Sequence, residues 1–170
     1  FLAGHHRLGR GFQVPEPVVM GEGGRLPPDR LICNDADGNA EQSRYDPAED
    51  GLDFYESLEG MLVQVSEPVV VGSMRAAKGE LEVVGAGGRR PTTPTARGGL
   101  ALLKGDQNPE RITVDLKGDP DVTAQQIQPL VVGDRFAGPI VGVLDYGGLA
   151  YKILPAGPSP AFREPAVPQA

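Results

Sequence analysis

The sequence has no tryptophan, and aromatic residues make up only 5% of its 170 positions. The side chains of its hydrophobic core must therefore be mainly valine, leucine and isoleucine, of which the β-branched members favour strands. No apolar run approaches the roughly 18 residues that a membrane-spanning helix needs. We therefore expect a soluble chain that has no membrane partner.

Cysteine and histidine are also scarce. Cys33 is the single cysteine, so no disulfide can form within the chain. The two histidines, His5 and His6, are adjacent near the N-terminus, where we interpret them as part of a polar tail. Neither a Ser-His-Asp nor a Cys-His arrangement can be assembled from these residues. This scarcity argues against an independent hydrolytic enzyme.

Acidic residues outnumber basic ones, and the net charge of −7 argues against a general binder of nucleic acid or anionic membranes. The charges are unevenly distributed. Eleven acidic residues and two arginines lie between Asp29 and Glu67, whereas six basic and two acidic residues lie between Gly72 and Lys104. This asymmetry marks either an electrostatic site or two solvated loops that face different ways.

Glycine and proline are abundant, with 24 and 17 residues, and predict many turns and long loops. Between them lie short β-favouring runs, whose spacing is typical of a sandwich or a barrel. The segment from Asp145 to Tyr151 predicts a hairpin in which Gly147 and Gly148 supply positive φ. We expect strands at 18–20, 61–65, 68–71, 80–84, 100–103, 111–116, 130–132, 135–144 and 150–154.

Helix is expected to be rare and short. Asp46 and Asp53 are candidate N-caps for one-turn helices, and 123–128 is a third candidate segment. Five prolines from Pro155 onward predict extended conformation. We therefore divide the chain into a flexible N-terminal segment (1–13), one all-β domain (14–155) and a proline-rich linker or tail (156–170).

Three stretches carry a family signature: GLDFYESLEGMLVQV at 51–65, NPERITVD at 108–115 and VGVLDYGGLAYKILP at 141–155. Their order and wording resemble the β-rich region that precedes the catalytic domain in large secreted bacterial nucleases of the endonuclease/exonuclease/phosphatase superfamily. The resemblance implies a single distorted barrel or sandwich with kinship to the oligonucleotide-binding fold. Where this chain has Gly147-Gly148-Leu149, such proteins more often carry an aromatic residue.

The same resemblance implies a secreted, extracellular protein and a non-catalytic role. The chain would support a nuclease catalytic domain in the same parent chain, and would guide extracellular DNA to it. The parent protein would be a metal-dependent phosphodiesterase. The alternative is a free-standing extracellular structural module, which would form homo-oligomers or bind partner chains, helped by exposed strand edges.

One motif invites a catalytic interpretation. Gly105-Asp106-Gln107-Asn108 has the form of the superfamily's Gly-Asp-x-Asn motif, but the Pro-Glu-Arg-Ile that follows matches the accessory region. We therefore interpret Asp106 and Asn108 as turn residues that bond nearby backbone, with Asn108 held extended by Pro109.

The best candidate for an ion site is the acidic segment that begins at Asn34. Asp35, Asp37 and Asn39 alternate around a glycine, and Asp46 could complete a shell of oxygen ligands for Ca²⁺. The spacing departs from the twelve-residue calcium loop. The alternative is an acidic loop of Asx-turns without an ion.

The best candidate for a polyanion site is the loop that carries Arg89, Arg90 and Arg97. Three arginines among glycine, proline and threonine could follow a phosphate backbone, and threonine hydroxyls can donate to phosphate. No aromatic residues are interleaved with them to stack on bases. The alternative is a solvated or partner-facing loop.

Overall fold

The structure is a computed structural model that describes residues 11, 13–35, 44–72, 74–75, 77–118, 130–157 and 162–163. The described chain is all-β with little helix, as predicted. Its helices are α1 (Gly51–Glu56) and the 3-10 turns η1 (Ala86–Gly88) and η2 (Leu116–Gly118). Its strands are β1 (Val18–Met20), β2 (Leu62–Val65), β3 (Val69–Val70), β4 (Glu80–Val84), β5 (Ile112–Asp115), β6 (Arg135–Phe136), β7 (Ile140–Tyr146), β8 (Tyr151–Pro155) and β9 (Phe162–Arg163).

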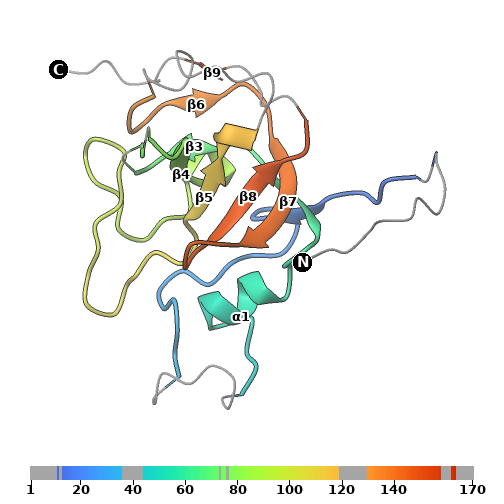
Figure 1. Cartoon of the computed structure of the whole chain (residues 1–170). Coiled ribbons are helices and arrows are strands. Elements are labelled where there is room, and N and C mark those ends of the chain that lie inside the picture. The colour runs from blue at the N-terminus through green and yellow to red at the C-terminus, as the bar shows by residue number, and fades with distance from the viewer. Residues whose placement is uncertain are drawn as a thin grey trace.

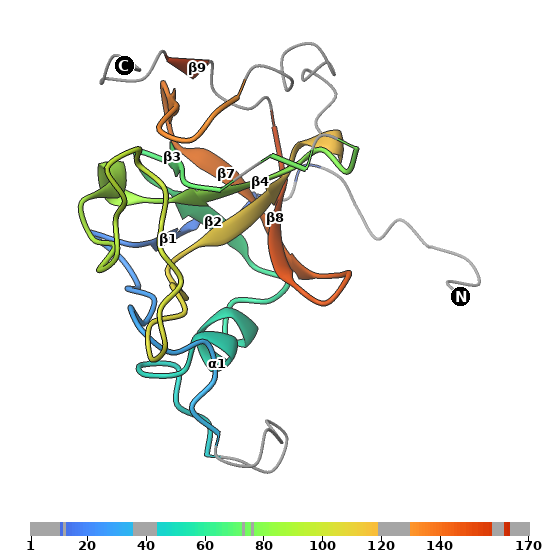
Figure 2. The same cartoon turned by 90° about the vertical axis from the view of Figure 1, so that its left-hand side faces the viewer.

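The strands form one mixed sheet in the order β1-β2-β7-β8-β5-β4-β3-β6-β9. β1 pairs with β2 in parallel and so does β5 with β8, while the other pairs are antiparallel. The sheet curves around its core to form an open half-barrel, and α1 lies below one end of it (Figures 1 and 2). Long loops connect β1 to α1 and β4 to β5.

Three expected strands differ from the structure. The run 100–103 contributes only isolated bridges, Pro94 to Leu100 and Leu103 to Asp106. The run 130–132 is a turn, in which the Val131 amide donates to the Asp134 carboxylate. The run 135–144 is divided into β6 and β7 by residues 137–139. These runs have strand composition, but composition cannot show whether a partner strand lies beside them.

The β7–β8 hairpin is confirmed, although its turn residues differ from the expected pair. The Gly147 amide donates to the Ala150 carbonyl at 3.0 Å. The positive φ values belong to Gly148 (66°) and Leu149 (68°) rather than to Gly147 and Gly148. Successive positive φ at the two central positions is the type I′ pattern, which matches the twist of the flanking strands. Leu149 therefore holds a conformation that its side chain disfavours.

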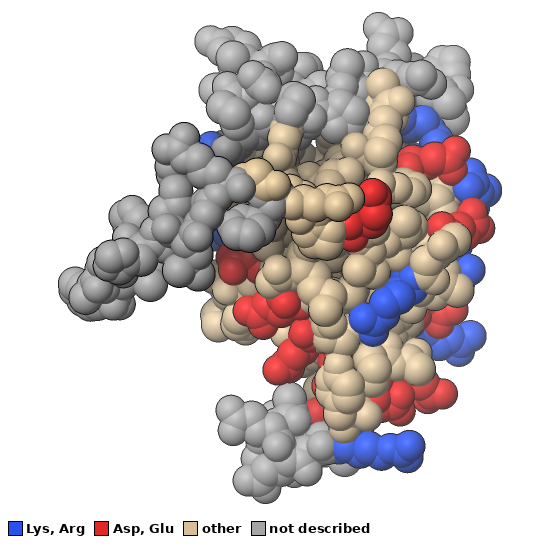
Figure 3. Space-filling model, turned by 90° about the vertical axis from the view of Figure 1, so that its right-hand side faces the viewer, with Lys and Arg blue, Asp and Glu red and all other residues tan. Residues whose placement is uncertain are grey.

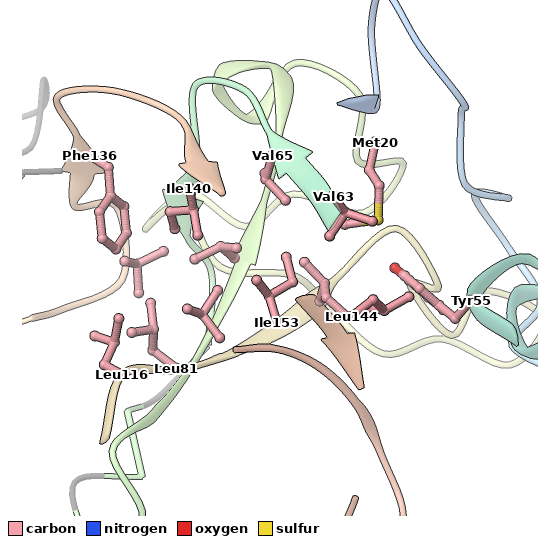
Figure 4. Close-up of a cluster of buried hydrophobic side chains, with 14 of the residues drawn as sticks. Met20, Tyr55, Val63, Val65, Leu81, Leu116, Phe136, Ile140, Leu144 and Ile153 are labelled. Carbon is pink, nitrogen blue, oxygen red and sulfur yellow. The ribbon is translucent and has the colours of Figure 1, made fainter. Parts of the chain in front are cut away.

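The hydrophobic core lies on the inner face of the sheet (Figure 4). Val63, Leu144 and Ile153 come from three adjacent strands and have no exposed surface. Tyr55 of α1 lies at one end of this cluster, and Phe136 of β6 lies at the other (Figure 4). The helix therefore closes one end of the half-barrel, while aliphatic side chains fill the middle, as the lack of tryptophan predicted.

Much of the two expected terminal segments, 1–13 and 156–170, lies outside the described residues, and so does the candidate helix 123–128. Within the described part, no helix has the length and apolar character required to span a bilayer.

Candidate functional site

The helix α1 begins at a buried aspartate that joins two parts of the chain. One oxygen of Asp50, Oδ1, accepts hydrogen bonds from the Leu52 and Asp53 amides, and the other, Oδ2, accepts one from the Asn34 amide at 2.7 Å. Asp50 is therefore the N-cap. The expected starts at Asp46 and Asp53 were wrong: the Asp46 carbonyl closes a turn, and Asp53 lies in the first turn of α1.

The three stretches on which the sequence resemblance rests, 51–65, 108–115 and 141–155, meet at this end of the half-barrel. The Tyr55 hydroxyl donates to the Pro109 carbonyl at 2.7 Å, and its ring stacks on Tyr151 of β8 with centroids 5.6 Å apart. The Gly60 amide donates to the Leu144 carbonyl of β7 at 2.8 Å. These contacts join residues that are 54 to 96 positions apart in sequence. In this chain the three stretches therefore form a structural brace.

Beside this brace lies a small, mainly apolar cavity of about 30 Å³. Glu110 lines it, and both of its carboxylate oxygens are buried without a hydrogen-bond partner. Burial raises the pKa of Glu110 to about 7, and the negative charges of Asp106 and Asp29 add to the effect. The nearby dipole of its own backbone amide, which makes no hydrogen bond of normal geometry, and the charge of Arg111 offset only part of this rise in pKa. A perturbed, unpartnered carboxyl in a cavity is a candidate functional group.

The acidic segment assembles only part of the expected ion site. Asp35 lies within ligand distance of Cys33 and Asp50, whereas Asp46 is held elsewhere by a bond from its amide to the Asp53 carboxylate. Asp37 and Asn39 lie outside the described residues. Both oxygens of Asp50 already accept backbone hydrogen bonds. A calcium site here stays a prediction.

Cys33 is a weak metal ligand in this cluster. The backbone amide of Asp35 lowers the pKa of the Cys33 thiol, but partial burial and the charges of Asp50 and Asp35 outweigh it, so the pKa lies above its ordinary value. A thiol binds metal as the thiolate, which this environment disfavours.

The three arginines of the candidate polyanion site, Arg89, Arg90 and Arg97, have different surroundings. Arg89 donates to Glu22 at 3.0 Å and to Glu67 at 2.7 Å, and these bonds raise the pKa of the guanidinium. Arg90 is exposed and lines the cavity of Glu110, and Arg97 is exposed further along the loop. Among the described residues, neither Arg90 nor Arg97 forms an ion pair. Of the three arginines, only Arg90 and Arg97 therefore have a positive charge that no described carboxylate neutralises.

Asp106 and Asn108 are turn residues, as expected. Asp106 accepts from the Asn108 amide and from the Thr92 hydroxyl, and the buried Asn108 side chain accepts from Thr93 and donates to Ala101. The expected extended conformation of Asn108 was wrong, because its φ is +54°. Asparagine tolerates this region, and its side-chain bonds hold it there.

A row of apolar side chains crosses the outer face of the sheet. Leu62 of β2 pairs with Val143 of β7, which pairs in turn with Leu154 of β8, so the three lie on one face. Val143 and Leu154 are 38% and 36% exposed. Figure 3 shows the side of the molecule on which β7 lies, with uncharged side chains filling most of its middle and charges of both signs alternating along one margin.

Sequence reasoning missed Glu110 and the outer row. Glu110 stands in the polar stretch Asn108 to Arg111, and the apolar side chains around it come from β1, α1 and β4. The outer row becomes visible only when the register of β2, β7 and β8 is known. The alternation along β7 was the one local signal of this row. It places Val143 on the other face of the sheet from its neighbour Leu144, which is buried.

The comparisons with known proteins give one match. No curated protein and no solved structure matches the chain. The family model described as "Domain of unknown function (DUF8508)" matches residues 19–163, which include every strand that the structure describes except the first residue of β1. The chain therefore belongs to the DUF8508 family.

Proposed function

We propose that this chain is the non-catalytic accessory domain of a secreted nuclease of the endonuclease/exonuclease/phosphatase type. It would support a catalytic domain in the same parent chain. The proposal originates in the resemblance of the three signature stretches. Their convergence on the brace around Tyr55 and Pro109 supports it, because such residues stabilise a scaffold rather than perform chemistry.

The outer row of Leu62, Val143 and Leu154 is the main structural support for this role. An antiparallel sheet face that meets only water is usually polar. Charge begins two residues away on the same two strands, where Asp145 of β7 lies opposite Lys152 of β8. Lys152 also pairs with Asp115 of the neighbouring strand β5 at 3.0 Å. An apolar centre with a polar rim suits a protein surface, and we assign it to the catalytic domain.

Guidance of DNA is the second part of the proposed function. All three arginines of the loop are exposed, but Arg89 is paired with Glu22 and Glu67, whereas Arg90 and Arg97 form no ion pair with any described residue. Two phosphate contacts give weak binding that falls steeply with salt. Such a contact would hold a strand near the catalytic domain without reading its sequence.

Fluorescence anisotropy with a labelled DNA duplex tests this part at low and at physiological salt. We expect weak, salt-sensitive binding that is lost in the double variant Arg90→Ala/Arg97→Ala. The matched control is Lys78→Ala/Lys117→Ala, which removes two exposed cations outside the loop and should bind like wild type. Equal loss in both variants would reduce the effect to net charge and would contradict a role for the loop.

The rival proposal, a free-standing assembly module, uses the same outer row. Sedimentation velocity over a range of protein concentrations separates the two. An accessory domain whose partner is a different domain should remain monomeric. An assembly module should form oligomers that Val143→Ser and Leu154→Ser disrupt.

A further inference from the structure

A second, larger cavity lies at the end of the half-barrel opposite to α1, where β6 leads into β7 (Figure 1). One wall is the bend between β2 and β3, from Gln64 to Pro68, and the other is the segment from Arg135 to Pro139. The pairing of Val65 with Ile140 holds the two walls together. The cavity is half-open and measures about 450 Å³, within the roughly 300–1,000 Å³ of small-molecule sites.

Polar side chains of this cavity have hydrogen-bond donors that no described residue uses. The Arg135 guanidinium donates to the Gly87 carbonyl at 3.2 Å, and it forms no ion pair with a described residue. It has five N–H donors in all. The Ser66 hydroxyl accepts from the Gln64 side-chain amide at 3.0 Å and donates to no described group. All three lining residues are partly exposed, so the cavity presents spare donors and one unpaired positive charge.

The position of the Arg135 guanidinium depends on Gly87. A Cβ at Gly87 would lie 3.3 Å from Nη1 of Arg135 and 2.9 Å from Nη1 of Arg89, so the missing side chain leaves the space in which both groups lie. Arg89 is paired with Glu22 and Glu67, whereas Arg135 is bound only by the Gly87 carbonyl. A guanidinium that is already positioned loses less conformational entropy when it binds an anion.

The charges around the cavity restrict the anion. Glu67 lines it, and its carboxylate is 60% exposed and pairs with Arg89 at 2.7 Å. A second negative charge on the ligand would meet this carboxylate and be repelled. One carboxylate, by contrast, can accept two parallel hydrogen bonds from a single guanidinium. Ala137 and Pro139 are exposed apolar residues on the wall that carries Arg135, so an apolar group can lie against them.

We propose that this cavity binds a small organic monocarboxylate with a compact apolar group, and that Arg135 pairs with its carboxylate. The Ser66 hydroxyl is a second donor on the opposite wall, and Ala137 and Pro139 contact the apolar group. Either a free acid or the C-terminus of a peptide carries this chemistry. The inference is independent of the proposed nuclease role.

The test follows the Nε–H signal of Arg135 and the backbone amide signal of Ser66 by NMR, in the full chain labelled with ¹⁵N at pH 7. The probe is benzoate, and benzamide is the uncharged control of nearly the same shape. We expect saturable shifts of both signals with benzoate, and binding at least about tenfold weaker with benzamide. Isophthalate, which adds a second carboxylate, should bind more weakly than benzoate. Tighter binding of isophthalate would overturn the restriction to a monoanion.

Two variants separate the charge of Arg135 from its shape. Arg135→Gln, followed at the Ser66 amide, should weaken benzoate binding at least about tenfold, and Arg135→Lys, which keeps the charge but not the planar fork, at least about threefold. The matched control is Arg97→Gln, since Arg97 is also exposed without an ion pair to a described residue but lies outside the cavity, and it should bind like wild type. Unchanged amide shifts of β7 in free Arg135→Gln would show that the fold is intact.

A peptide probe identifies the source of the carboxylate. Tighter binding of acetyl-Ala-Ala-Phe than of benzoate, lost when the peptide C-terminus is amidated, would assign the site to a peptide end, and the reverse would assign it to a free acid. Equal binding of benzamide and benzoate, or full benzoate binding by Arg135→Gln, would overturn the proposal.

Discussion

The hydroxyl of Tyr55 donates a hydrogen bond to the carbonyl oxygen of Pro109 at 2.7 Å, across 54 residues of sequence. This bond ties α1 to the loop before β5, and a longer bond of 3.3 Å reaches the Arg111 carbonyl. Tyr55 is buried, and burial raises the pKa of its hydroxyl beyond the ordinary range, so it remains a donor. The loop before β5 is therefore fixed to α1 through one phenol.

Tyr55→Phe should destabilise the chain by about 1–3 kcal/mol, because the change leaves the Pro109 carbonyl buried without a donor. Urea unfolding followed by circular dichroism measures the loss. The control is Tyr146→Phe, since Tyr146 is 48% exposed and its hydroxyl can bond water. Equal stability of Tyr55→Phe and Tyr146→Phe would contradict the bracing role.

The stability of the wild-type chain should fall as the pH rises, and Glu110→Gln should abolish this fall. The folded pKa of about 7 lies above the ordinary 4.5, so the folded chain holds a proton that the unfolded chain releases between these values. Wild-type stability therefore decreases from about pH 4.5 to about pH 7 and levels off above it. At pH 8 the variant should melt roughly 2–4 °C higher than wild type.

Thermal melts at intervals of half a pH unit measure this dependence. Glu49→Gln, an exposed glutamate, should retain the wild-type slope. A Glu110→Gln profile parallel to that of wild type would show that the carboxyl does not titrate in the folded state as described.

Leu149→Gly should stabilise the hairpin by about 0.5–1 kcal/mol. Leu149 has a φ of +68° and is 91% exposed, so its side chain contributes strain and little packing. The matched control is Leu102→Gly, also largely exposed but without a positive φ, which should lose a similar amount. Loss of stability in both variants would show that the turn carries no strain.

Gly142→Ala should cost about 1–3 kcal/mol or more. A Cβ at this position would clash with the Leu154 carbonyl oxygen and lie 2.6 Å from Ile153 Cγ2, so β8 would have to move. Gly157→Ala has open space and should change stability by less than about 0.5 kcal/mol. Chemical denaturation of both variants gives the comparison, and equal values would argue against the close approach of β7 and β8.

Asp50→Ala should destabilise the chain by about 1–2 kcal/mol, because three backbone amides lose their acceptor. Asp50→Asn retains an acceptor oxygen for the cap and should lose less. Melting each variant in calcium and in EDTA separates the cap from an ion site. We expect the same loss in both buffers, whereas a loss confined to calcium would assign Asp50 to a metal shell.

The sequence predicted those parts of the fold that depend on neighbouring residues. The β7–β8 hairpin and the strand at 80–84 followed from alternation and turn residues. The start of α1 did not, because Asp46, Asp50 and Asp53 are all chemically suitable caps. Asp50 became the cap through bonds with the distant segment at 31–34, where Leu31 and Ile32 carbonyls accept from the first amides of the helix.

The candidate site was harder to predict for the same reason. Glu110 and Arg111 are adjacent charged residues, yet the first is buried beside α1 and the second pairs with Glu82 across the sheet. Likewise, Arg89 and Arg90 look equivalent in sequence, but only Arg89 meets two glutamates. Which of two adjacent charged residues forms an ion pair depends on the segments that pack against them. The local sequence does not show which segments these are.

The mass of the natively expressed protein, with peptide mapping beyond Ala170, tests the proposed role as the accessory part of a secreted nuclease. We expect a longer product, recovered from the culture medium, that continues into a histidine- and aspartate-rich catalytic domain. A native product that ends at Ala170 would contradict it and would favour the free-standing assembly module.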